Sequence, residues 1–132
     1  MTKIAKRMAA IIGTFYVLLA VSAWLLPNPV IGSEGILKTN SEHDLVHAIL
    51  GAILIGCSLN GETVSSMGLY FAALLSLAFS VLGLMVLNGA GIGRIGDVVL
   101  VNAAANWFHA AMAVVCVISG MSNTASKQLI YD

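Results

Sequence analysis

The chain alternates four long apolar segments with short polar ones. The apolar segments are residues 8–26, 42–59, 67–87 and 98–120. A helix of about 20 apolar residues, rising about 1.5 Å per residue, spans the hydrocarbon core of a lipid bilayer. The pattern therefore predicts an all-α integral membrane four-helix bundle, with residues 1–132 forming a single transmembrane domain. We interpret the first segment as an uncleaved transmembrane helix.

A polar motif occurs twice, at the beginning of the second and of the fourth apolar segment. Its spacing is Asn, then Asp or Asn four residues on, then His three further, then a small residue four further. The two copies are Asn40, Asp44, His47 and Gly51, and Asn102, Asn106, His109 and Ala113. These spacings place each copy on one stripe of a helix. The constant offset of 62 residues predicts two parallel repeats of a helical hairpin, with halves of about 8–60 and 67–120.

The polar residues of the two copies form the predicted intramembrane cluster. Polar and ionisable side chains are costly inside a bilayer, so they generally point into the protein and find partners. Asp44 is one helical turn before His47, and Asn106 is one turn before His109, so each His has a predicted partner on its own helix. If the second and fourth helices face each other, the two stripes meet at one depth. We interpret His43, near the start of the second helix, as an interfacial residue.

Small residues mark the predicted helix-packing positions. On the third helix they are Ala72, Ser76, Ser80 and Gly83, and the small positions of the two motifs are Gly51 and Ala113. Small side chains at helical spacing allow helix backbones to approach closely in lipid. The third helix is therefore a predicted docking or interhelical surface.

Composition and charge narrow the function classes. Hydrophobic residues make up 59% of the chain and charged residues 9%, far below the roughly 25% of soluble domains, so the bilayer is the first predicted partner. The six basic residues are scattered, which excludes a nucleic-acid surface. With four spans, the side of the two termini carries Lys3, Lys6, Arg7 and Lys127, whereas the opposite side carries Lys38 and Arg94. This bias predicts that both termini are cytoplasmic.

Neither the two cysteines nor the glycine-rich loop is expected to form a functional site. Cys57 and Cys116 lie in apolar runs and are interpreted as buried thiols. Residues 88–97 predict a flexible or sharply turned loop. Its glycines match a dinucleotide-binding pattern, but a membrane helix precedes them instead of a buried strand, so we do not expect a nucleotide site.

Three functions remain open at this level. The favoured one is a noncatalytic accessory or structural subunit of a larger membrane complex. In this case the polar stripes form hydrogen bonds between helices, and no cofactor is bound. The alternative is a haem b or chlorophyll-type pigment ligated by His47 and His109. The third is movement of ions, metals or protons, with Asp44 and the histidines as ligands or relays. The serines have no evident base, so no enzyme is predicted, and no resident metal site is predicted.

The repeated motif at the head of the second and fourth of four hydrophobic segments resembles the small bacterial membrane proteins catalogued as domain of unknown function 4383. The similarity covers roughly residues 8–120. The matching positions are Asn40, Asp44, His47 and Gly51, together with Asn102, Asn106 and His109; Ala113 departs from the expected Gly. The resemblance implies a four-helix fold in a bacterial inner membrane, and it implies no established activity.

Overall fold

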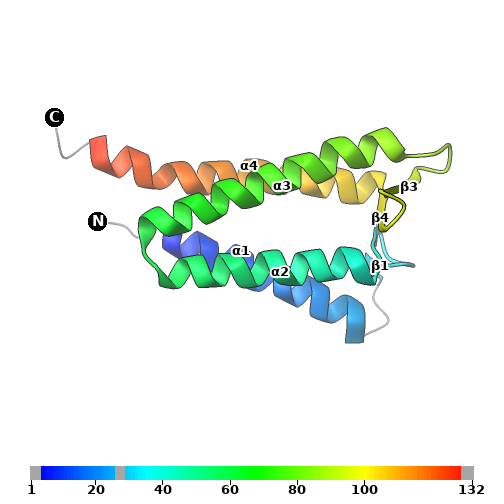
Figure 1. Ribbon diagram of the computed structural model, residues 1–132, viewed down its shortest axis with the longest axis horizontal. Helices are drawn as coiled ribbons and strands as arrows, with labels where there is room; N and C mark the ends of the chain where they lie inside the picture. The colour runs from blue at the N-terminus through cyan, green and yellow to red at the C-terminus, as the bar shows by residue number, and fades with distance from the viewer. Residues whose placement is uncertain (1–3, 26–28, 129–132) are drawn as a thin grey trace.

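Four helices account for most of the chain. The computed structural model describes residues 4–25 and 29–128, and of residues 123–128 only the backbone. The helices are α1 (Ile4–Leu25), α2 (Ser41–Leu59), α3 (Glu62–Val86) and α4 (Ala103–Gln128) (Figure 1). Each contains a stretch long and apolar enough to cross a membrane, which in α4 is Ala103–Ser122. The prediction of four helices with the length and composition of membrane spans is confirmed.

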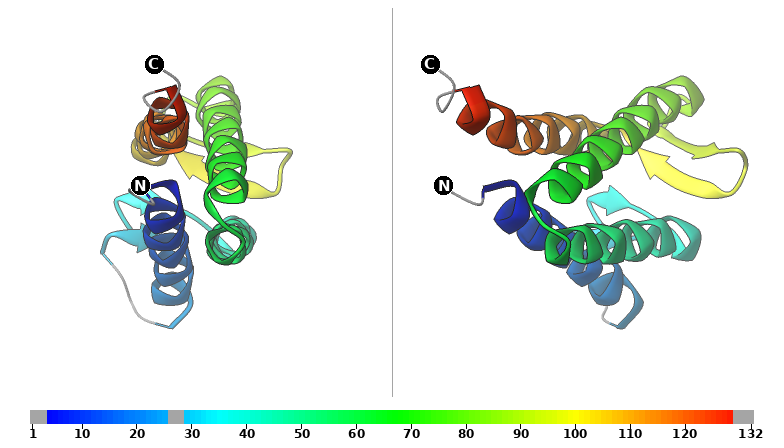
Figure 2. Two further views of the ribbon diagram at one scale, coloured as in Figure 1. Left: turned by 90° about the vertical axis from the view of Figure 1, so that its left-hand side faces the viewer. Right: turned by 60° about the vertical axis from the view of Figure 1, so that its left-hand side comes forward.

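The helices form two hairpins that lie one on the other. Helix α1 packs against α2, and α3 packs against α4 (Figures 1 and 2). In the first hairpin the backbones approach closely at Gly13 and Gly51. A Cβ added at Gly13 would lie 2.7 Å from the Gly51 carbonyl oxygen, and a Cβ added at Gly51 would lie 2.6 Å from the Gly13 carbonyl oxygen. Both positions therefore require glycine for this approach.

Two short strand pairs precede α2 and α4 at one end of the molecule. Strands β1 (Ile31–Gly32) and β2 (Leu37–Lys38) are parallel, and β3 (Ile92–Ile95) and β4 (Val99–Asn102) are antiparallel. The predicted start of the fourth helix at Val98 is therefore wrong. The run from Val98 to Val101 is rich in β-branched residues and pairs with Ile92–Ile95, a combination that favours a strand over a helix.

The first and third helices begin earlier than predicted. Helix α1 starts at Ile4, so it includes Lys6 and Arg7, which precede the apolar run. Helix α3 starts at Glu62, ahead of the predicted Met67, and the turn from α2 consists of Asn60 and Gly61. Gly61 has φ of 96°, a left-handed conformation that glycine adopts readily. The carboxylate of Glu62 accepts a hydrogen bond of 2.8 Å from the backbone N–H of Lys6, which ties this turn to α1.

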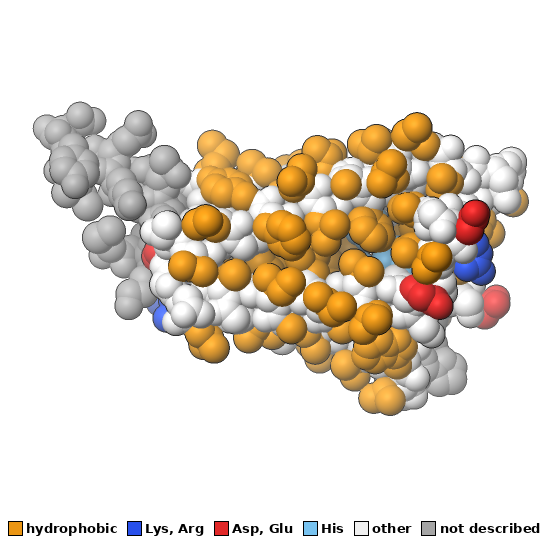
Figure 3. Space-filling model, viewed as in Figure 1, with side chains coloured by type: hydrophobic (Ala, Val, Ile, Leu, Met, Phe, Trp, Pro, Cys, Tyr) orange, Lys and Arg blue, Asp and Glu red, His pale blue; other side chains and the backbone are white. Residues whose placement is uncertain are grey.

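The outer surface has the polarity of a membrane protein. A belt of hydrophobic side chains covers the middle of the face in Figure 3, and charged side chains lie at the two ends. Within the spans, the share of residues buried inside the protein is 28% to 39%, so most of their apolar surface points outward. The interior is narrow and is filled around Tyr16, Leu50, Leu54 and Leu69. The first residues of α1 and the last of α4 lie at the end opposite to the strands (Figure 1).

Candidate functional site

Asn40 begins α2 and also reaches across to the other hairpin. Its Oδ1 accepts a hydrogen bond from the backbone N–H of His43 at 3.3 Å, which caps the helix. The same oxygen accepts a bond of 3.1 Å from the N–H of Leu100, and Nδ2 donates to the carbonyl oxygen of Val98 at 2.7 Å. Asn40 therefore connects the start of α2 to the chain that leads into α4.

Asn102 makes the equivalent set of bonds in the opposite direction. Its Oδ1 accepts from the N–H of Ala105 at 2.9 Å, which caps α4, and from the N–H of Lys38 at 3.3 Å. Its Nδ2 donates to the carbonyl oxygen of Ile36 at 2.9 Å. Each of these three partners is offset by 62 residues from the corresponding partner of Asn40. The two asparagines thus exchange matching bonds between the hairpins.

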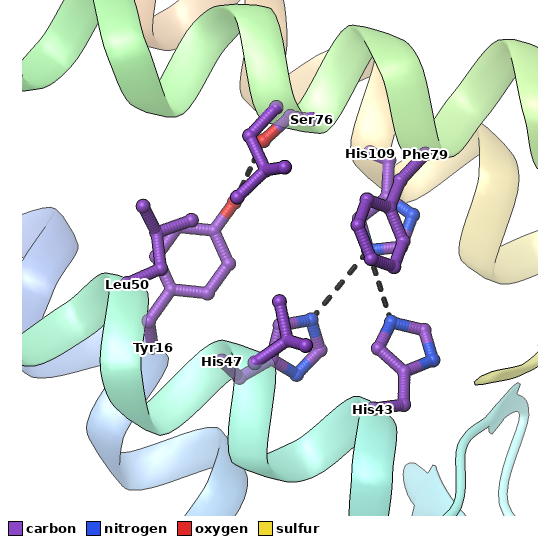
Figure 4. Close-up of a pocket in the computed structure, with 9 residues that line it drawn as sticks. Tyr16, His43, His47, Leu50, Ser76, Phe79 and His109 are labelled. Atoms are coloured by element: carbon purple, nitrogen blue, oxygen red, sulfur yellow. Dashed lines mark hydrogen bonds between the residues drawn. The ribbon is translucent and has the colours of Figure 1, made fainter. Parts of the chain in front are cut away.

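His47 of α2 and His109 of α4 lie next to each other in the interior (Figure 4). Their side chains are 4% and 3% exposed, and their Nε2 atoms are 3.5 Å apart. The two polar stripes that the sequence analysis identified therefore meet at these rings.

His43 belongs to the same cluster, and its interpretation as an interfacial residue is wrong. Its side chain is 0% exposed, and its Nε2 lies 3.3 Å from Nε2 of His109. Its Nδ1 lies 2.7 Å from the carbonyl oxygen of Leu100. The signal was present in the sequence, since His43 precedes His47 by four residues and such residues share a helix face. The cluster contains all three histidines of the chain, and one ligand atom from each lies within 4.8 Å of the others.

The predicted pairs within each helix are not formed. Five buried atoms of the two stripes have no hydrogen-bond partner: Asp44 Oδ1, His47 Nδ1, Asn106 Oδ1, Asn106 Nδ2 and His109 Nδ1. The predicted bonds from Asp44 to His47 and from Asn106 to His109 are therefore wrong. The imidazole rings instead turn their Nε2 edges toward each other across the helix interface, and Nδ1 of His47 and of His109 makes no hydrogen bond.

Aromatic and aliphatic side chains enclose the histidines. The ring of Tyr16 from α1 lies 5.4 Å from that of His47, and the ring of Phe79 from α3 lies 5.4 Å from that of His109 (Figure 4). The Tyr16 hydroxyl hydrogen-bonds the Ser76 hydroxyl at 3.2 Å. The free space beside the three rings is about 10 Å³, which is roughly the room of one water-sized sphere.

The predicted packing residues are buried. They are Gly51 on α2, Ala72, Ser76, Ser80 and Gly83 on α3, and Ala113 on α4. At Gly83 a Cβ would collide with the side chain of Asn106, so the missing side chain makes room for the amide. Ala113 is 7% exposed and lines an apolar groove of about 560 Å³ between α3 and α4. Tyr70, Leu77 and Val117 are among the other residues that line this groove.

The chain was also compared with known proteins. No family model, no curated protein and no solved structure matches it. The resemblance to domain of unknown function 4383 therefore stays a prediction, and the function has to be argued from the geometry.

Proposed function

We propose that this protein is a small noncatalytic integral membrane subunit, a four-helix bundle built from two parallel repeats of a hairpin. The reciprocal bonds of Asn40 and Asn102, with partners offset by 62 residues, support the repeat. The proposed location is a bacterial inner membrane. Lys6 and Arg7 lie near the start of α1, and the excess of basic residues on that side favours cytoplasmic termini.

The observation that supports an accessory role is the groove between α3 and α4. Its floor contains Ala73, Ala110 and Ala113, and larger apolar residues such as Leu74 and Val114 form its walls. In lipid, helices associate through close packing over small residues, because apolar burial alone gives little drive. We therefore assign the groove to one transmembrane helix of a partner protein.

A pair of neighbouring substitutions on α4 tests this assignment. Ala110→Leu fills the groove, whereas Ala111→Leu adds the same side chain at an exposed position of the same helix that does not line it. In membranes solubilised with a mild detergent, we expect the native protein and Ala111→Leu to migrate in one complex containing a second membrane protein. Ala110→Leu should migrate alone.

Two results would contradict the proposal, the first its accessory role and the second its binding surface. One is a native protein that migrates as a monomer or in a complex of this chain only. The other is a complex that both variants leave intact, since the groove would then not be the binding surface.

The geometry gives less support to a haem or pigment. Two axial histidines must lie on opposite faces of a macrocycle. Here the Nε2 atoms of His47 and His109 are 3.5 Å apart, His43 contacts His109 from α2, and the free space is about 10 Å³. An absorption spectrum of the purified protein, oxidised and then reduced with dithionite, tests this. We expect no haem or pigment bands.

Movement of ions or protons has equally little support. Among the described residues that line the space beside the histidines, Val46, Leu50, Leu75 and Phe79 are apolar. The polar side chains beside the histidines are Tyr16 and Ser76, whose hydroxyls bond to each other. Transport requires a longer series of polar groups leading away from the cluster.

A further inference from the structure

We propose that His43, His47 and His109 form a binding site for a single copper(I) ion held by their three Nε2 atoms. The first argument is distance. Two nitrogen ligands at about 2.0 to 2.1 Å from a metal lie roughly 3.3 to 3.6 Å apart when the angle between them is tetrahedral or trigonal. Two of the three pairs fall in this range, His43 and His109 at 3.3 Å and His109 and His47 at 3.5 Å. The three ligand atoms lie within 4.8 Å of one another, so a small ring rotation brings the third pair, His43 and His47, onto the ion.

The second argument is the count of ring hydrogens. A neutral imidazole carries one N–H. His43 donates its hydrogen from Nδ1 to the carbonyl oxygen of Leu100, so its Nε2 presents a lone pair. Nε2 of His109 faces this lone pair and also Nε2 of His47. A single hydrogen on Nε2 of His109 can be donated to only one of these two nitrogens, so one contact stays without a hydrogen. A cation between the three rings instead accepts a lone pair from each Nε2.

The third argument concerns the Nδ1 atoms, which become N–H donors when Nε2 binds a metal. Histidine ligands usually donate this hydrogen to a backbone carbonyl or a carboxylate. His43 already has Leu100 as its acceptor. Asp44 Oδ1 and Asn106 Oδ1 are buried acceptors without partners, each one turn before a histidine whose Nδ1 also has no partner. We assign Asp44 and Asn106 as the acceptors that these two Nδ1 atoms would reach after a rotation of the side chains on metal binding, which makes them positioning residues.

Imidazole binds several transition metals. The charge of the ion and the space available beside the rings favour copper(I) among them. Zinc sites are almost always four-coordinate, with a water or a fourth protein ligand. The free space of about 10 Å³ holds the ion and no additional water, and the other described lining residues near the rings are mostly apolar. A monovalent ion brings less charge into this buried site than a divalent ion does, and burying charge away from water is costly.

The test is anaerobic titration of the purified protein in detergent with copper(I) buffered by a competing chelator. We expect one copper per chain, with X-ray absorption showing nitrogen ligands at about 2.0 Å. His43→Ala should weaken binding more than about 100-fold, and Asp44→Asn about 10-fold, the range found when supporting residues of metal sites are changed. Because His43 is fully buried and donates to the Leu100 carbonyl oxygen, His43→Ala also destabilises the fold, so its stability is measured separately.

Cysteine and methionine also bind copper(I), so a control without thiols is needed. Cys57→Ser with Cys116→Ser should keep the native affinity. Three results would overturn the proposal: copper binding that survives His43→Ala and is lost with the cysteines, no binding above that of His43→Ala, or a preference for zinc(II) over copper(I). The unfolding midpoint of metal-free His43→Ala, measured in parallel, separates loss of the site from loss of the fold.

Discussion

The reciprocal bonds of Asn40 and Asn102 lead to a quantitative prediction. Asn40→Ala removes one helix-capping bond and the two bonds to Val98 and Leu100. It also removes an exposed bond to the Glu42 carboxylate, which contributes little because water replaces it. Loss of a cap costs about 1 kcal/mol, and each of the bonds to Val98 and Leu100 contributes about 0.5 to 1.5 kcal/mol. We expect the free energy of unfolding to fall by about 2 to 4 kcal/mol. Asn102→Ala removes the equivalent three bonds and should cost the same.

The double variant tests whether the two asparagines act together. Both hold the junction between the two hairpins at the strand end of the molecule. Once either one is lost, the junction loosens and the remaining bonds contribute less. The double variant should therefore lose less than the sum of the two single losses.

Unfolding can be followed through the thiol of Cys116, which is 0% exposed in the folded protein. In a Cys57→Ser background, a maleimide reagent labels Cys116 as denaturant unfolds the detergent-solubilised protein. Asn60→Ala is the matched control, because its amide makes one exposed bond, to the Gly56 carbonyl oxygen. If Asn40→Ala or Asn102→Ala costs no more than this control, or if the two costs differ widely, the reasoning from reciprocal bonds is refuted.

Two further predictions use the same unfolding assay. Gly13→Ala should destabilise the protein by about 1 to 3 kcal/mol, because the added Cβ meets the backbone of Gly51 at 2.7 Å. The control Gly56→Ala has nothing within 4 Å of the added Cβ and should be neutral or slightly stabilising. Equal effects of the two substitutions would contradict the close approach of α1 and α2. Tyr16→Phe should lower the free energy of unfolding by about 0.6 to 1.7 kcal/mol, because the hydroxyl bond to Ser76 is lost. Adding Ser76→Ala to this variant should lower it little further. Fully additive losses would mean that the bond does not form.

Much of the fold followed from the sequence, because it depends on local patterns. Helix length and apolar composition are set by the bilayer, so four spans were readable from the residues alone. The offset of 62 residues between the copies of the motif was also visible, and it identified Asn40, Asn102, His47 and His109. The spacing of the small residues of α3 indicated that they share one helix face, and that face is buried.

Only the tertiary structure decided what these residues contact. The side-chain amides of Asn40 and Asn102 bond to segments about 60 residues away, and no local pattern encodes such a partner. The strand at Val99–Asn102 depends on pairing with Ile92–Ile95, so reading the segment by hydropathy alone extended α4 too far. The prediction that His43 is interfacial was wrong, because the burial of its side chain depends on the second hairpin that covers it. The sequence thus determined which faces are polar, and packing between the hairpins determined that three imidazoles converge in one small buried space.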